Sequence, residues 1–109
     1  MLIAVAGPYS AKTEEQQALN LKAMNAAAAE VYKKGHIPVI GVNASLYVAD
    51  ELPGKDRKKV ISDISYAVVN RCDAILVIGS SPGADHEKKL LEEKGLPVYY
   101  SIDEIPPII

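Results

Sequence analysis

The segment 79–87 carries the densest group of residues with chemical potential. Its sequence is Gly79-Ser80-Ser81-Pro82-Gly83-Ala84-Asp85-His86-Glu87, with two hydroxyls and two glycines just before an expected helix. The first-turn N–H groups of such a helix are unpaired and suit an anion or a sugar hydroxyl. A carboxylate at Glu87 can face back toward the preceding strand and act as a nucleophile or base. In the plainer alternative, Asp85 and Glu87 only complement the helix dipole.

A second candidate is the loop Gly7-Pro8-Tyr9-Ser10, which follows an apolar run. Gly7 allows the backbone to approach a ligand closely, and Tyr9 can stack on a planar ring. The alternative is a tight turn with a half-buried tyrosine. Neither glycine-rich phosphate-binding motif occurs here, which argues against dinucleotide oxidoreductases and P-loop NTPases.

These loops need a scaffold, and the chain alternates apolar runs with helical patterns. Strands are expected at 2–6, 37–40, 74–78 and 97–101, with helices at 13–34, 55–71 and 83–94. Thr13 and Gln16 match a capping box, Gly35 ends the first helix, and Pro38 indicates a strand start or an edge. Residues 42–54 look the least regular, with room for a short helical turn, and 102–109 is expected to wrap the surface.

Helical crossovers between strands require parallel pairing with right-handed connections. The expected fold is therefore α/β: a small doubly wound, flavodoxin-like or Rossmann-like parallel sheet of about four to five strands with helices on both faces. Ligands bind such sheets beyond the carboxyl ends of the strands. That edge holds the loops 7–12, 41–54 and 79–87, and adds Asn43, Ser45 and Tyr47 as candidate contacts to a ligand.

Composition narrows the classes of function. The 109 residues fit one domain, 1–109, and the net charge of -2 argues against nucleic acid as a partner. The single cysteine, Cys72, and the two histidines, His36 and His86, argue against a disulfide and a metal site. Apolar runs are short and the start lacks a basic lead, so we expect a cytoplasmic protein without a membrane partner.

Several segments together resemble the nucleoside 2-deoxyribosyltransferase superfamily, in particular its small bacterial and phage branch. They are Ile3-Ala4-Val5-Ala6-Gly7-Pro8-Tyr9-Ser10, Arg71-Cys72-Asp73-Ala74-Ile75-Leu76-Val77, Ser81-Pro82-Gly83-Ala84-Asp85-His86-Glu87 and Gly95-Leu96-Pro97-Val98-Tyr99-Tyr100. Their order and spacing cover nearly the whole chain. The chain departs from the small branch in lacking tryptophan, and Lys88-Lys89-Leu90 replaces the usual small and aromatic residues.

The resemblance implies a hydrolase or transferase of nucleotide metabolism. Such an enzyme cleaves or transfers at the N-glycosidic bond of a deoxynucleoside or its 5′-monophosphate, without a cofactor. Glu87, four residues after Gly83, would be the nucleophile that forms a covalent sugar ester, following the retaining logic of glycoside chemistry. Asp63 is the nearest match to the family's general acid, although Ser65 stands at the more regular spacing from Asp73. The alternative is that Asp63 is a solvated or capping residue.

The same resemblance implies that Ser81 contacts a sugar or phosphate, with Ser80, Gly83 and the 7–10 loop completing the substrate site. It also implies a homodimer or higher homo-oligomer, while Asp73 reads as structural. Two alternatives remain open. One is a non-catalytic nucleotide-binding module on the same fold, and the other is an interaction domain with a degenerate pocket.

Overall fold

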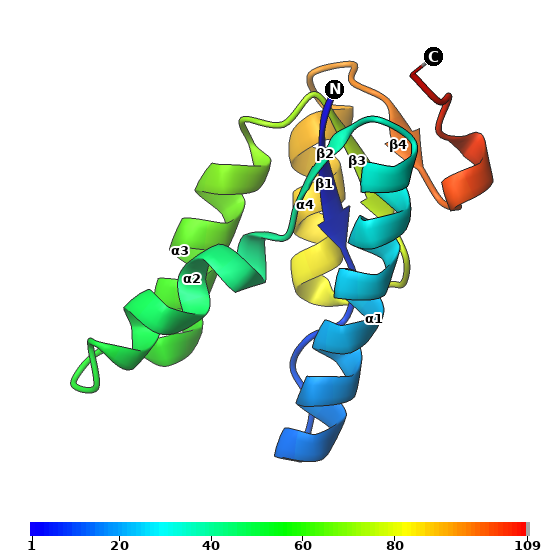
Figure 1. Cartoon of the computed structure of the whole chain (residues 1–109). Helices are drawn as coiled ribbons and strands as arrows, with labels where there is room; N and C mark the ends of the chain where they lie inside the picture. Colours follow the sequence, from blue (N-terminus) through cyan, green and yellow to red (C-terminus); the bar gives the residue numbers. More distant parts are fainter. Residues whose placement is uncertain (109) are drawn as a thin grey trace.

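The computed structural model describes residues 1–108, which form a parallel sheet with helices on both of its faces (Figure 1). In this part of the chain the sheet has four strands in the order β2-β1-β3-β4. The elements are β1 (Leu2–Ala6), α1 (Glu14–Lys33), β2 (Ile37–Val39), α2 (Gly41–Asp50), α3 (Arg57–Val69), β3 (Ala74–Val77), α4 (Pro82–Glu92), β4 (Val98–Tyr99) and the short 3-10 helix η1 (Ile102–Glu104).

The strand order confirms the predicted doubly wound α/β fold. From β1 the chain moves to one side for β2 and to the other side for β3 and β4. All neighbouring strands are parallel, and Ala6 at the end of β1 is in register with Val77 at the end of β3. The switch in strand order lies between β1 and β3, so a ligand crevice is expected beyond their carboxyl ends.

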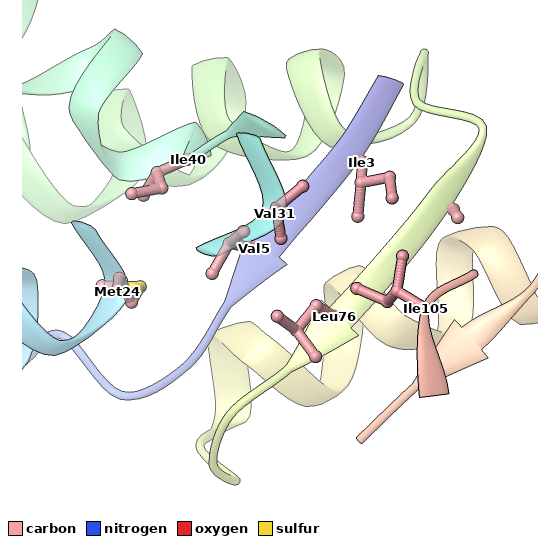
Figure 2. Close-up of a cluster of buried hydrophobic side chains, with 8 residues drawn as sticks. Ile3, Val5, Met24, Val31, Ile40, Leu76 and Ile105 are labelled. Atoms are coloured by element: carbon pink, nitrogen blue, oxygen red, sulfur yellow. The ribbon is translucent and has the colours of Figure 1, made fainter. Parts of the chain in front are cut away.

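Both faces of the central strands are buried, and two apolar clusters result. Ile3 and Val5 of β1 point to one face, where they meet Met24 and Val31 of α1 (Figure 2). Side chains with the alternate spacing, such as Ala4, point to the other face and join the cluster that contains residues of α3 and α4. Successive side chains of a strand point to opposite faces, which explains the unbroken apolar runs.

The ends of α1 follow the predicted signals. The Thr13 hydroxyl accepts a 3.1 Å hydrogen bond from the backbone N–H of Gln16 and caps the helix. At the other end Gly35 has a φ of 92°, a left-handed conformation that glycine adopts without steric cost. The helix buries Met24 and Val31 against the sheet, whereas Ala18 is exposed.

The prediction for 42–54, an irregular segment with at most a short helical turn, is wrong, because Gly41–Asp50 is the ten-residue helix α2. Its buried residues are Gly41, Ser45 and Ala49, which share one face at a spacing of four. These small residues let α2 pack closely along α3, and the two helices extend together away from the sheet (Figure 1). The spacing of four between these small residues is typical of a helix, whereas the polar residues between them are typical of a loop.

The remaining corrections concern element ends and the C-terminal segment. Asp56 caps α3, which runs from Arg57 to Val69 and is shorter than the predicted 55–71. β4 is limited to two residues. The segment after it lies on the surface only in part, because Ile105 is 1% exposed and belongs to a core cluster. Lys34 Nζ holds this segment through 2.6 and 2.8 Å hydrogen bonds to two of its backbone carbonyls.

Candidate functional site

A cavity of about 380 Å³ lies at the carboxyl ends of β1 and β3 and is bordered on its far side by α3. This volume falls in the range of small-molecule sites. Most of its walls come from four segments: the loop after β1, the start of α2, one face of α3 and the first turns of α4. The lining residues are Gly7, Tyr9, Ser10, Val42, Lys58, Ile61, Ser62, Ser65, Tyr66, Ser81, Pro82, Gly83, Ala84 and Glu87.

Glu87 is the buried acidic side chain of this cavity. It is 6% exposed, and its Oε2 accepts a 2.6 Å hydrogen bond from Ser65 Oγ. Burial raises the pKa of Glu87 from 4.5 to about 7, and the hydrogen bond from Ser65 opposes part of that rise. A carboxyl group with this pKa is substantially ionised near neutral pH, which suits a nucleophile or a proton-transfer group.

The loop after β1 reaches the cavity through close backbone packing at Gly7. A Cβ at Gly7 would come within 2.7 Å of Ile78 Cγ1, so the glycine lets the end of β1 lie against the residue that follows β3. Asn20 of α1 donates a 3.0 Å hydrogen bond to the backbone oxygen of Tyr9 and holds the loop in place. The Tyr9 ring is partly buried against the core cluster, so it presents a fixed aromatic wall.

The start of α4 forms the opposite wall. Ser81 is the N-cap residue, and its hydroxyl accepts a 3.1 Å hydrogen bond from the backbone N–H of Ala84. The hydroxyl proton is still available for donation to a ligand. Gly83 lies beside Tyr66, where an added Cβ would be 3.9 Å from the phenol oxygen. The Tyr66 ring in turn packs on His86, with 4.1 Å between ring centroids.

Six of the predicted site residues come together around this cavity. They are Gly7, Tyr9, Ser10, Ser81, Gly83 and Glu87. Five predicted substrate contacts do not line it, among them Ser45 and Tyr47 of α2. Pro8 packs against Gly79, and Ser80 donates to the Asp85 carboxylate. Asn43 is exposed and donates a 2.9 Å hydrogen bond to Asn25, because α2 turns this side chain away from the cavity.

The structure does not bring the predicted acid to Glu87. Asp63 is an exposed residue of α3, and its carboxylate pairs with Lys59 one turn earlier, at 2.8 Å. Ser65, two residues later, occupies the place beside Glu87. A shift of two positions turns a helical side chain to nearly the opposite face, which explains the separation.

The face of α3 that lines the cavity was not predicted as part of the site. Lys58, Ser62 and Ser65 follow a helical spacing of four and three, so they share one face, to which Ile61 and Tyr66 add apolar area. Lys58 is exposed to solvent and borders the cavity. The sequence feature that could have indicated this face is the pair Ser62 and Ser65 within an otherwise apolar helical stripe.

Other candidate groups contribute to structure. Cys72 is buried, and burial raises the pKa of its thiol to about 11, with smaller contributions from Asp73 and Glu87. Such a thiol is a poor nucleophile. Within residues 1–108, no group of three or more His, Cys, Asp or Glu side chains is arranged to hold a metal ion. None of the helices over the same span combines the length and apolar character that a bilayer crossing requires.

Comparison of the sequence with protein-family models and with curated proteins finds no match. The function must therefore be argued from the cavity and its residues.

Proposed function

We propose that this protein cleaves or transfers at the N-glycosidic bond of a deoxynucleoside or deoxynucleoside 5′-monophosphate. The observation that carries the proposal is the Glu87 carboxyl group, buried at the cavity wall with one oxygen held by Ser65. The resemblance to nucleoside 2-deoxyribosyltransferases rests on the same residue and on its spacing from Gly83.

In the proposed reaction Glu87 acts as a nucleophile. A carboxylate oxygen forms an ester bond to C1′ while the C1′–N bond breaks, and the base departs with the bonding electron pair and takes up a proton from water. Water or a second base then attacks C1′ and releases the sugar from Glu87. Both displacements pass through oxocarbenium-like transition states.

The other lining residues suit the parts of a nucleoside. The Tyr9 ring offers a stacking surface for the base. Ser81 and the start of α4 are suited to a sugar hydroxyl or a phosphate, because unpaired helix N–H groups favour negative charge. Lys58 adds a positive charge at the border of the same cavity.

The test is incubation with each deoxynucleoside and deoxynucleoside monophosphate, with detection of free base by chromatography. We expect release by the wild-type protein and loss of at least a hundredfold in Glu87→Gln. Intact-mass analysis of the protein during turnover should show an added deoxyribosyl group in the wild type only. Asp63→Asn is the matched control, since Asp63 does not line the cavity. Undiminished release by Glu87→Gln would refute the proposal.

A second candidate, a non-catalytic nucleotide-binding module, is favoured by one observation. Among the described residues, Glu87 is the sole carboxylate that lines the cavity, because Asp63 pairs with Lys59 outside it. A binding module predicts a rise in unfolding temperature with a deoxynucleoside monophosphate and no release of base.

We also propose that the chain forms a homodimer or higher homo-oligomer. Tyr47 and Val48 near the end of α2 and Leu52 just after the helix are exposed, and Tyr47 is 83% exposed. Apolar side chains gathered on a protruding helix are typical of a protein interface. Light scattering after size-exclusion chromatography should give a mass above that of one chain, and Tyr47→Glu should reduce it.

A further inference from the structure

Three helices meet at the buried hydroxyl of Ser65. This residue of α3 is 3% exposed and donates its 2.6 Å hydrogen bond to Glu87 Oε2 on α4. A length of this kind is typical of a charge-assisted bond between a hydroxyl and a carboxylate. Over residues 1–108, no other hydrogen bond reaches the Glu87 carboxyl group. Because no fully buried side-chain oxygen there lacks a partner, Oε1 is an accessible atom.

Gly41, the first residue of α2, confines Ser65 from the other side. A Cβ at Gly41 would overlap with Ser65 Oγ and would come within 2.9 Å of the Ser65 backbone oxygen. Gly41 is buried, and no larger residue fits there unless α2 and α3 separate. The Ser65 hydroxyl is therefore enclosed between the backbone of α2 and the carboxyl group of Glu87.

We propose that Ser65 is a positioning residue, which holds Oε2 of Glu87 and thereby directs Oε1 toward the anomeric carbon of a substrate in the cavity. The proposal rests on the proposed function for the identity of that carbon. Oε1 forms the ester bond as the C1′–N bond breaks, the base keeps the electron pair and takes up a proton from water, and Ser65 keeps its proton throughout. Gly41 supports this arrangement because it leaves room for the hydroxyl.

The surroundings of Glu87 give Ser65 a second effect, on the ionisation of the nucleophile. Burial disfavours the charged carboxylate, whereas a donated hydrogen bond favours it. The other titratable groups around Glu87 form no hydrogen bond to it in residues 1–108. They are Tyr9 before α1, Lys58 and Tyr66 on α3, Cys72 before β3, and Asp85 and His86 on α4.

The experiment compares Ser65→Ala with Ser45→Ala in the full chain. Ser45 is a matched control, since it is a buried helical serine that donates to the Val42 backbone oxygen and does not line the cavity. Carbon-13 NMR titration of the Glu87 carboxyl carbon, assigned by its loss in Glu87→Gln, reports the pKa without any need for turnover. We expect Ser65→Ala to raise the pKa of Glu87 further, and Ser45→Ala to leave it unchanged.

Kinetics supply the second readout. In Ser65→Ala we expect kcat at neutral pH to fall about tenfold with little change in KM, because the contact acts on Glu87 and not on substrate binding. The acid limb of the pH profile should move to higher pH. Ser65→Cys keeps the shape of the side chain but donates only a weak hydrogen bond, so it should act in the same direction, and it provides the test if Ser65→Ala fails to fold.

The outcomes separate the two proposals. An unchanged Glu87 pKa in a folded Ser65→Ala, or in Ser65→Cys where Ser65→Ala does not fold, would overturn the role of Ser65, whatever the activity. A raised pKa in Ser65→Ala, together with absence of base release by the wild type, would support the role of Ser65 on the carboxylate and refute the glycosidic chemistry.

Discussion

The carboxylate of Asp73 accepts a 2.8 Å hydrogen bond from the backbone N–H of Leu2, 71 positions earlier in the chain. The contact joins the beginnings of β3 and β1, at the end of the sheet opposite the cavity. In return, the Asp73 N–H donates to the Leu2 carbonyl at 2.7 Å. This reciprocal pair sets the register of the two central strands.

Replacement of Asp73 by alanine should lower the free energy of unfolding by about 1 kcal/mol, the contribution of one exposed hydrogen bond. Asp73→Asn keeps a side-chain acceptor and should lose less. Urea unfolding at neutral pH measures both. Equal losses in the two variants would show that the hydrogen bond to Leu2 is not the source of the effect.

The rate of base release should rise with pH. Glu87 must be ionised to attack, and burial holds its pKa at about 7. Below that value kcat/KM should fall roughly tenfold for each pH unit, and above it kcat/KM should level off. Initial rates between about pH 5 and pH 9, with circular dichroism at each pH as a check of folding, test this expectation. A profile that falls with pH would contradict the role of Glu87 as nucleophile.

Stability should show the opposite dependence on pH. The folded protein holds the Glu87 proton more tightly than the unfolded chain, because the pKa rises from 4.5 to about 7. As pH rises through this window, the unfolded state loses its proton first and folding becomes less favourable, by up to roughly 3 kcal/mol above pH 7. Glu87→Gln removes the titration and should be more stable than wild type at pH 8.

Thermal or urea unfolding at pH 5 and pH 8 measures this difference. At pH 5 wild type and Glu87→Gln should be similar in stability, since the wild-type carboxyl group is then largely protonated in the folded state. If the two proteins keep the same difference at both pH values, Glu87 does not titrate in this window.

The cluster on the α4 face of the sheet should depend strongly on Leu91. This side chain is 0% exposed, whereas Leu19 on α1 is 59% exposed. Leu91→Ala should cost about 2–5 kcal/mol through lost burial and a residual cavity, and Leu19→Ala less than about 1 kcal/mol. Chemical denaturation checks both. Similar losses in the two variants would contradict the assignment of Leu91 to the core.

The parallel sheet was predictable because the sequence features that indicate its strands and helices lie within each element. The unbroken run Ala74–Val77 indicates a strand covered on both faces. The Thr13 hydroxyl caps the start of α1, and the left-handed backbone of Gly35 ends it. The helix α2 was missed because small residues such as Ser45 and Ala49 are ambiguous until a partner helix is known. Packing against α3, not propensity, defines this element.

The candidate site was predictable where residues follow strands. The loops after β1 and β3 were expected at one edge, and the cavity unites Gly7, Tyr9 and Glu87 there. The contribution of α3 was not predictable from motif spacing, since it depends on how a helix remote in sequence is rotated. That rotation places Ser65 inward and leaves Asp63 paired with Lys59.

The position of Pro38 bears on how the molecules behave at high concentration. The N–H of Ile37 donates to the Met1 carbonyl, so the backbone nitrogen of the next residue, Pro38, points away from β1. An incoming strand from another molecule would find no donor at that point. The short outer strand therefore resists extension into intermolecular β-structure, and a fibril seeded on this side would begin with a missing hydrogen bond.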